Sequence, residues 1–371
     1  MAISLKSLRE QVIVITGASS GIGLVTARAA AKKGARLVLA SRNEEALEQI
    51  TEQIRMEGGE AVYMVTDVGN REEVQRLAET AIRHYGGFDT WVNNAGVSIY
   101  GKLAEVSEED NRRLFDTNFW GVVSGSLIAA SHLRNRGGAI INLGSELSDV
   151  AIPLQGMYAA SKHAVKGFTD ALRMELEEEA APVSVTLIKP AGIDTPYPQH
   201  ARNYTEHELT LPPPVYAPEE VAAAILHAAT HPERDIFVGS GSKMMSSLNK
   251  YAPSLMDWIN KSFMTKAQVT DAPARHTEGS LHQPGADGME HGHYKGHVMK
   301  KSLYTRASMH PVLTGTMVAA ASAAAIALMN KRKNKKGRLN APVQRYEGTP
   351  IRQHEGTQVR HREGEPPMYN I

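Results

Sequence analysis

The sequence contains no cysteine among its 371 residues. This absence excludes a disulfide scaffold, a thiolate metal site and a cysteine nucleophile. An excess of one charge sign is also missing, because 41 Lys and Arg balance 40 Asp and Glu. The balance hides an asymmetry: residues 331–371 carry 10 Lys and Arg against 4 Glu, so the rest of the chain is mildly acidic. A nucleic-acid enzyme would more often have a basic body, so no nucleic-acid partner is expected.

The first ten residues lack the apolar run of a secretory signal, so a cytoplasmic domain is expected. Six histidines between His276 and His310 lack the regular spacing of metal ligands, and no metal site is predicted. Apolar residues make up 42% and charged residues 22% of the chain, as in ordinary globular proteins. A wholly disordered or collagen-like chain is therefore excluded.

Short β-rich runs alternate with helical patterns up to about residue 240. The predicted strands are 11–16, 36–40, 61–65, 88–93, 138–143, 183–189 and 235–239. The predicted helices are 22–33, 43–57, 70–85, 107–133, 157–179 and 217–230. Nearly continuous apolar strands suit a sheet buried on both faces. This alternation predicts an α/β fold with a Rossmann-type, doubly wound parallel sheet of about seven strands, in a domain spanning residues 1–242.

A C-terminal extension follows this domain. Residues 243–266 have helical periodicity interrupted at Pro253, and the Gly-, His- and Pro-rich stretch 267–310 is predicted to be a flexible linker. An Ala-rich apolar helix is expected over 311–330, and a basic disordered tail over 331–371. Residues 312–329 carry no charge and would be about 27 Å long as a helix, just enough to cross a bilayer. A membrane segment or interfacial anchor and a soluble helix both remain open.

The first strand leads into a glycine-rich turn, Thr16-Gly17-Ala18-Ser19-Ser20-Gly21-Ile22-Gly23, and then into a helix. Small residues allow the backbone to approach a pyrophosphate closely, and the helix N-terminus presents free N–H groups to it. The turn lies at the first strand-to-helix connection of a doubly wound pattern, the context that such a motif requires. We therefore predict a dinucleotide site here.

Five motifs in order resemble the short-chain dehydrogenase/reductase family over roughly residues 8–240. They are the G-x-x-x-G-x-G turn, Asn93-Asn94-Ala95-Gly96, Asn118, Ser145 and Tyr158-Ala159-Ala160-Ser161-Lys162. The resemblance implies a catalytic set of Ser145, Tyr158, Lys162 and Asn118. It also implies pairing into a homodimer or tetramer through helices 107–133 and 157–179.

The end of the second strand bears on the choice of cofactor. An NAD site usually places an acid here to accept from the ribose 2′-hydroxyl, whereas this chain has Ala40-Ser41-Arg42-Asn43. The Arg42 guanidinium can fork onto phosphate oxygens, so NADP(H) is predicted over NAD(H). With Arg42, the resemblance implies the following cofactor-binding residues: Gly17, Ser19, Ser20, Gly21, Ile22, Gly23, Asp67, Val68, Asn94, Ala95, Gly96, Tyr158, Lys162, Pro190, Ile193 and Thr195. The family's Pro-Gly motif is altered, because Ala191 follows Pro190.

Tyr158 and Lys162 are four residues apart in a helical stretch, so they share one face. A nearby ammonium and an oxidised nicotinamide both favour the phenolate, and we predict that the pKa of Tyr158 is lowered. Tyr158 would then exchange a proton with an alcohol or carbonyl oxygen, which Ser145 would also bind. Asn118 would extend a proton path from Lys162.

The predicted function is an NADP(H)-dependent oxidoreductase acting on a small alcohol or carbonyl substrate. Residues 193–216, with Tyr197, His200, Tyr204 and Leu211, are the expected substrate loop. The alternative is a catalytically silent NADP(H)-sensing or scaffold protein recruited through its C-terminal tail.

Overall fold

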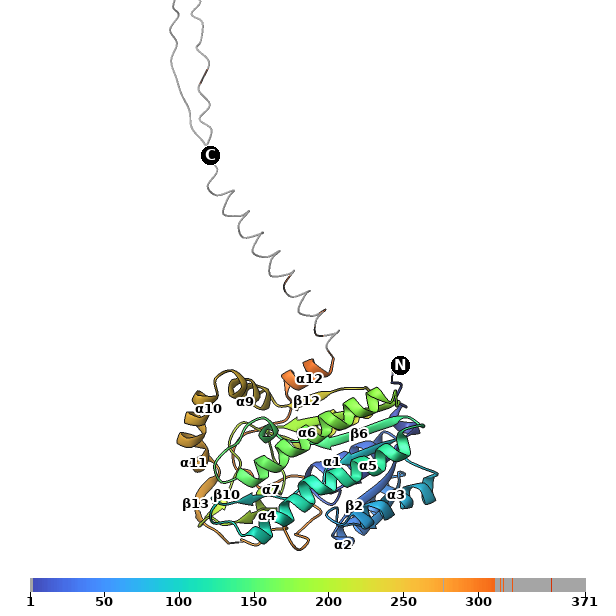
Figure 1. Ribbon diagram of the computed structural model, residues 1–371, viewed down its shortest axis with the longest axis horizontal. Coiled ribbons are helices and arrows are strands. Elements are labelled where there is room, and N and C mark those ends of the chain that lie inside the picture. Colours follow the sequence, from blue (N-terminus) through green and yellow to red (C-terminus); the bar gives the residue numbers. More distant parts are fainter. Residues whose placement is uncertain are drawn as a thin grey trace, which may run out of the picture. The chain divides into compact units, whose positions relative to one another are not determined.

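Seven parallel strands form the central sheet, in the order β12-β7-β6-β4-β1-β2-β3. Figure 1 presents the computed structural model, which describes residues 3–275 and 277–310 together with residues 314, 316, 322 and 348. The sheet strands are β1 (Val12–Thr16), β2 (Arg36–Ser41), β3 (Glu60–Val65), β4 (Thr90–Asn93), β6 (Gly138–Leu143), β7 (Val183–Pro190) and β12 (Asp235–Val238). They coincide with the seven predicted runs to within one or two residues, and the predicted doubly wound sheet is confirmed.

Helices cover both faces of the sheet. One face carries α1 (Gly21–Lys32), α2 (Glu44–Met56) and α8 (Pro218–Ala228), whose apolar residues pack against alternate strand positions such as Ile15. The other face carries α3 (Arg71–Tyr85), α5 (Gly121–Leu133) and α6 (Gly156–Glu178), packed on the intervening positions such as Val14. Figure 1 shows α5 and α6 lying over the sheet. Because both faces are covered, the strands are almost entirely apolar.

The predicted helix 107–133 consists of three segments. They are α4 (Glu108–Phe115), a π-helical turn η2 (Asp116–Trp120) and α5. The periodicity of apolar residues predicted one continuous helix, because a single π turn shifts the repeat by only one residue. Such turns are rare and are frequent at functional sites.

Short elements surround the carboxyl ends of the strands. A 3-10 turn, η3 (Glu146–Ser148), follows β6, whereas another, η1 (Leu8–Glu10), lies at the amino end of β1. The substrate-loop region holds β8 (Gly192–Ile193), α7 (Tyr197–His200), β9 (Arg202–Asn203), β10 (His207–Leu209) and β11 (Val215–Tyr216). Strand β9 pairs with β5 (Ile99–Tyr100), and β11 pairs with β8.

The helical extension forms α9 (Ser240–Tyr251), α10 (Pro253–Ile259), a π turn η4 (Asn260–Met264) and α11 (Thr265–Ala267). Helix α9 ends and α10 begins around Pro253, where the sequence predicted an interruption. In the part of the chain that the structure describes, no helix is long and apolar enough to cross a membrane. Most of the predicted segment 312–329, and nearly all of the tail 331–371, lie outside the described residues.

The range 267–310, predicted to be a flexible linker, differs from that prediction. It contains β13 (Val269–Pro273), which pairs with β10, β14 (Val298–Met299), which pairs with β11, and α12 (Leu303–Met309). Leu281 is fully buried, and Thr305 of α12 donates to the carbonyl of Phe237 in β12. The described residues up to Thr314 belong to one structural unit. The low apolar content of this range favoured the prediction of a flexible linker. The range is instead held in place mainly by its backbone groups and by single anchoring side chains.

Candidate active site

A cleft opens at the carboxyl ends of the central strands, where doubly wound sheets bind their ligands. It comprises two adjoining cavities that share Ile22, Asn94, Gly96, Thr195 and Tyr197 in their walls. The first is also lined by the following residues: Tyr100, Leu143, Ser145, Glu146, Leu147, Ile152, Gln155, Tyr158, Lys162, Pro190, Ile193 and Leu211. The second lies along the glycine turn, between Gly17, Ser20 and Gly21 on one side and His200 on the other.

The conformation of the glycine turn is fixed by hydrogen bonds to Asn94 and Ala95, which follow β4. Asn94 Nδ2 donates to the carbonyls of Thr16 and Gly17 at 2.9 and 3.0 Å, and the Thr16 hydroxyl accepts from the backbone N–H of Asn94 and Ala95 at 3.1 Å each. Gly17 has a φ of +64°, and a Cβ on Gly23 would lie 2.0 Å from the Gly17 carbonyl oxygen. Pyrophosphate-binding turns have this backbone geometry, although the Gly21 N–H already donates to the Met289 carbonyl at 2.8 Å.

Tyr158 and Lys162 lie one turn apart on α6 and face the same cavity. The Lys162 Nζ donates to the Leu143 carbonyl at 2.8 Å and lies 5.7 Å from the centre of the Tyr158 ring. Burial lowers the pKa of Lys162 to about 8. The ammonium is thus held by the end of β6 and not by the phenol oxygen.

The pKa of Tyr158 differs from the prediction. Burial raises it above its ordinary value, and the neighbouring hydroxyls of Tyr197 and Ser145 offset only part of this effect. The predicted lowering relied on the charges of Lys162 and of an oxidised nicotinamide, but the Lys162 Nζ binds a backbone carbonyl and is itself desolvated. Tyr158 is therefore a neutral phenol that can donate a proton.

Ser145 begins the turn η3 after β6. Its hydroxyl accepts from the Leu147 backbone N–H at 3.1 Å, and its own N–H donates to the Ser148 hydroxyl at 3.1 Å. Both bonds fix the turn locally, so that the Ser145 hydroxyl reaches Tyr158.

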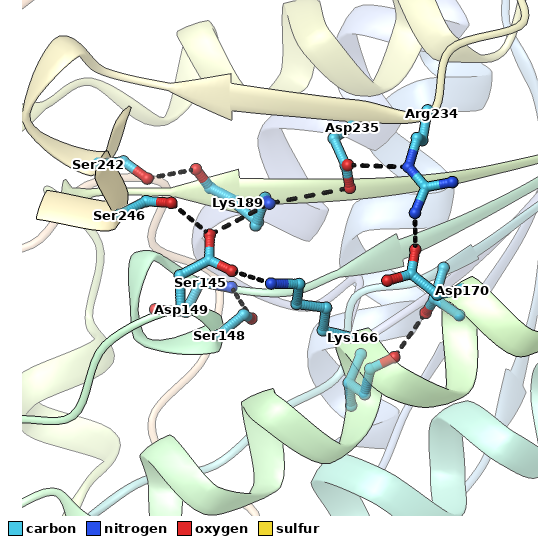
Figure 2. Close-up of polar contacts among 12 residues, drawn as sticks. Ser145, Ser148, Asp149, Lys166, Asp170, Lys189, Arg234, Asp235, Ser242 and Ser246 are labelled. Carbon is cyan, nitrogen blue, oxygen red and sulfur yellow. Dashed lines mark hydrogen bonds and ion pairs between the residues drawn. The ribbon is translucent and has the colours of Figure 1, made fainter. Parts of the chain in front are cut away.

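A buried ionic network holds the other end of this turn, as Figure 2 shows. The Asp149 carboxylate binds Lys166 of α6, Lys189 of β7 at 3.2 Å and the Ser246 hydroxyl of α9 at 2.9 Å. Although burial alone would raise the pKa of Asp149, the Lys166 hydrogen bond and the Lys189 charge bring it below its ordinary value. Three elements are thereby tied to the turn that carries Ser145.

Asn118 lies in the π turn η2 and is fully buried. Its Oδ1 accepts from the Val97 N–H at 2.8 Å, while its Nδ2 donates to the Val97 carbonyl at 2.9 Å and to the Ser161 hydroxyl at 3.3 Å. Through these bonds the π turn is connected to Val97, next to Gly96, and to α6, the helix that carries Tyr158 and Lys162. The four predicted catalytic residues are thus brought close together.

The predicted residues after β7 lie in the cleft wall. Pro190, Ile193 and Thr195 line the first cavity, and the Thr195 hydroxyl donates to the Ile193 carbonyl at 3.4 Å. Ala191 does not have a positive φ, so the backbone requires no glycine at this position.

The predicted adenosine end, by contrast, is covered by another part of the chain. Arg42 donates to backbone carbonyls of residues 280–283, and Ser19 donates to Asp287. The Asp67 carboxylate binds Arg113 at 2.6 Å, and Val68 is buried beside Gly121. We refer to residues 280–290 as the strap.

Several cleft residues were missed as individual site residues. Tyr100, Glu146 and Gln155 line the first cavity, and burial raises the pKa of Glu146 to about 7. Tyr197, predicted only as part of the substrate loop, donates to Gln155 Oε1 at 3.1 Å. The position of Glu146 directly after Ser145 was the only sequence signal for any of them.

Comparison with known proteins agrees with this geometry. The family model described as short chain dehydrogenase matches residues 11–206. An uncharacterized oxidoreductase of Bacillus subtilis, YxnA, is 47% identical over 85% of this chain and 90% of its own length. A match of that extent necessarily includes the strap. The 11-beta-hydroxysteroid dehydrogenase A of Sesamum indicum is 33% identical over 67% of this chain and 74% of its own length.

Solved structures of dehydrogenases are also similar to this chain. A short chain dehydrogenase/reductase from Burkholderia phymatum in complex with NAD has a TM-score of 0.61 and 29% identity, over 68% of this chain and 96% of its own. An alcohol dehydrogenase from Thermococcus sibiricus complexed with 5-hydroxy-NADP has a TM-score of 0.55 and 28% identity, over 62% of this chain and 95% of its own. The chain belongs to the short-chain dehydrogenase family and is an oxidoreductase of that family.

Proposed function

We propose that the protein transfers a hydride between a nicotinamide dinucleotide and an alcohol or carbonyl carbon, with Tyr158 as general acid and base. The observation that carries this proposal is the convergence of Tyr158, Ser145 and Lys162 on one cavity that adjoins the glycine turn. The bound dinucleotide would supply the hydride or accept it.

Tyr158 has the proton that carbonyl reduction needs. Because burial raises the pKa of its phenol, the group is protonated at neutral pH and can donate to a carbonyl oxygen as that oxygen gains charge. The Ser145 hydroxyl, held by the η3 turn, would donate to the same oxygen and orient it. For oxidation, Tyr158 would first release its own proton along the path behind Lys162, and the phenolate would then accept the proton of the substrate hydroxyl.

Lys162 and Asn118 support the proton transfer. With a pKa of about 8, Lys162 carries its charge at neutral pH, and one turn of α6 separates it from Tyr158. The Asn118 amide binds the Val97 backbone N–H and the Ser161 hydroxyl. We propose that Asn118 thereby positions Lys162 and a path for protons behind Lys162.

The cavity favours a substrate with an apolar body and a polar end. Leu147, Ile152 and Leu211 provide apolar walls, and the buried Tyr100 hydroxyl has no hydrogen-bond partner among the described residues. A substrate hydroxyl or carbonyl placed there would satisfy it. The sesame relative is named for a steroid substrate, which supports a medium-sized lipophilic alcohol or carbonyl compound here.

The test is oxidation of NADH and of NADPH by the purified full chain, against aldehydes and ketones of increasing chain length, beside Tyr158→Phe. The variant keeps the ring and removes the proton donor. We expect turnover to fall by about 10²-fold or more while dinucleotide binding is retained. Undiminished turnover would overturn the role of Tyr158. Dinucleotide binding without turnover on any compound would instead support the silent sensing or scaffold alternative.

We also propose a homo-oligomer formed through the outer faces of η2, α5 and α6. Trp120, Leu127 and Met174 are exposed there by 54, 40 and 58%. Exposed large apolar side chains on neighbouring helices favour burial against a second copy. Sedimentation velocity would report a dimer or tetramer, and a monomer at micromolar concentration would contradict the proposal.

The preference for NADP(H) over NAD(H) rests on Arg42 and stays a prediction. In the structure the Arg42 guanidinium donates to backbone carbonyls of the strap, so these donors are not directed at an open phosphate site.

A further inference from the structure

The strap crosses the predicted adenosine end of the cleft and lies outside the region that matches the family model, residues 11–206. On one side it binds α4, where the His282 ring lies 2.7 Å from the Asp110 carboxylate. On the other side it binds α1, where Glu290 pairs with Arg28 at 2.6 Å. The strap therefore spans this end of the cleft from α4 to α1.

The strap occupies the polar groups of the two residues that follow β2. The Arg42 guanidinium donates to the backbone carbonyls of residues 280–283, the last three at 3.1, 3.3 and 3.5 Å. Asn43 Nδ2 donates to the Gly285 carbonyl at 3.2 Å. In a dinucleotide-binding fold this strand end meets the adenosine ribose. Here its donors are directed instead at neutral oxygens of the chain itself.

The strap also supplies oxygen atoms to the glycine turn. The Gly21 N–H, at the start of α1, donates to the Met289 carbonyl at 2.8 Å, and Ser19 Oγ donates to the Asp287 carboxylate at 2.9 Å. The Gly288 N–H donates in turn to the Ser19 carbonyl at 2.8 Å. A pyrophosphate at a helix N-terminus accepts from the same kinds of donor and likewise brings negative charge there. The strap thus takes the contacts that a dinucleotide needs at this turn.

The cleft does not extend beneath the strap. Ser19, Arg42 and Asp67 were predicted to bind the cofactor, yet they line neither of the two cavities of the cleft. Ser19 and Arg42 are in direct contact with the strap. A dinucleotide therefore cannot occupy the adenosine end while the strap is held there.

The strap is held by few buried groups. Leu281 is fully buried in a cluster with Val97, Ile99 and Leu114. From residue 282 to residue 301, by contrast, every residue is exposed or only half-buried. Segments with few buried apolar contacts are those that open locally at a small cost in free energy. One leucine and a set of exchangeable polar contacts hold the strap in place.

We propose that the strap is an autoinhibitory segment, which competes with the dinucleotide for the adenosine end of the cleft and is released when the dinucleotide binds. The inference rests on the proposed function, since it assumes that a nicotinamide dinucleotide binds this cleft. The apparent dissociation constant is then the intrinsic constant divided by the fraction of molecules in which the strap is open. Release also frees the Arg42 donors, on which the predicted preference for NADP(H) depends.

Calorimetry on the full chain, without substrate, measures the dissociation constants of NADH and NADPH. Leu281→Ala removes the anchor and leaves every residue that was predicted to bind the cofactor unchanged. We expect this variant to bind the preferred dinucleotide about tenfold more tightly than the wild type or better, because the lost anchor raises the open fraction. Leu303→Ala is the matched control, with the same substitution in the C-terminal segment at a side chain that is 85% exposed. It should leave both constants within about twofold of the wild type.

Hydrogen–deuterium exchange, measured by mass spectrometry on the wild type, gives the direction of the movement. Saturation with the preferred dinucleotide should speed amide exchange in residues 280–290, because the Gly288 N–H loses the Ser19 carbonyl. A strap that covered the bound dinucleotide as part of its site would show the opposite sign.

Slower or unchanged exchange in the strap would overturn the proposal. So would a Leu281→Ala variant that binds no more tightly than the wild type. Both results leave the proposed function intact, since each is obtained with a bound dinucleotide. Binding of neither dinucleotide, by the wild type or by Leu281→Ala, would instead refute the proposed function.

Discussion

Glu146 provides a quantitative test of the cleft as the structure describes it. Its carboxyl lies in the wall of the first cavity, and no cation among the described residues lies within ion-pair distance. Burial raises its pKa from 4.5 to about 7. At about 1.4 kcal/mol for each pKa unit, this shift corresponds to about 3 kcal/mol in favour of the neutral form. Water in the open cleft reduces that figure, and we expect an effect of about 1 to 3 kcal/mol.

The sign follows from proton uptake. Between pH 4.5 and 7 the folded protein holds the Glu146 proton that the unfolded chain has lost, so the contribution of this residue to stability falls as pH rises. Above about pH 7 the stabilising contribution of the Glu146 proton is fully lost. Glu146→Gln keeps the shape and removes the charge, so the variant should be more stable than the wild type at pH 8 by about 1 to 3 kcal/mol. At pH 4.5 the two should be nearly equal.

Urea unfolding followed by circular dichroism at pH 4.5, 6 and 8 would measure this difference. Glu48→Gln, on the exposed face of α2, is the control for a general charge effect and should give the same difference at all three pH values. A Glu146→Gln variant that is equally or less stable than the wild type at pH 8 would refute the reasoning. The carboxylate would then have a partner or enough water to remain charged at no cost.

Three further variants test other contacts. Leu281→Ala should free the strap at a cost of about 2 to 5 kcal/mol, seen as faster amide exchange in residues 280–290, and unchanged exchange would contradict the anchor. Asp149→Asn leaves Lys166 without its carboxylate and Lys189 with only Asp235 at 3.9 Å, and should destabilise the fold by about 3 kcal/mol, measured by thermal unfolding. Because the pKa of Asp149 is lowered, the wild-type advantage should persist at neutral pH and vanish as pH falls through that pKa. Asn118→Ala should reduce turnover more than dinucleotide affinity, and a selective loss of affinity would argue against a role behind Lys162.

Most of the fold was predictable because its signals repeat. Each sheet strand is a continuous apolar run between glycine or polar turns, and each covering helix shows a helical apolar period, so seven strands and their order of alternation could be derived. The cluster of Ser145, Tyr158 and Lys162 was predictable from motif spacing. The doubly wound topology brings the ends of β6 and α6 to the same edge of the sheet.

Contacts made by backbone atoms were not predictable. Arg42 was predicted to bind the cofactor, but its carbonyl acceptors in the strap leave no trace in side-chain patterns. The same holds for Lys162, whose Nζ donates to the Leu143 carbonyl, while burial raises the pKa of Tyr158. Helical periodicity likewise does not reveal the π turn at Asn118.

The position of the strap in the chain has a consequence for how the molecule is made. Synthesis proceeds from the N-terminus. All seven strands of the central sheet, and the segments that carry Ser145 and Tyr158, therefore leave the ribosome before Leu281 does. Until then, the apolar seat formed by Val97, Ile99 and Leu114 lacks the side chain that fills it. The nascent domain therefore displays an apolar surface at the predicted adenosine end of its cleft. That surface is covered only when the last part of this unit has been translated.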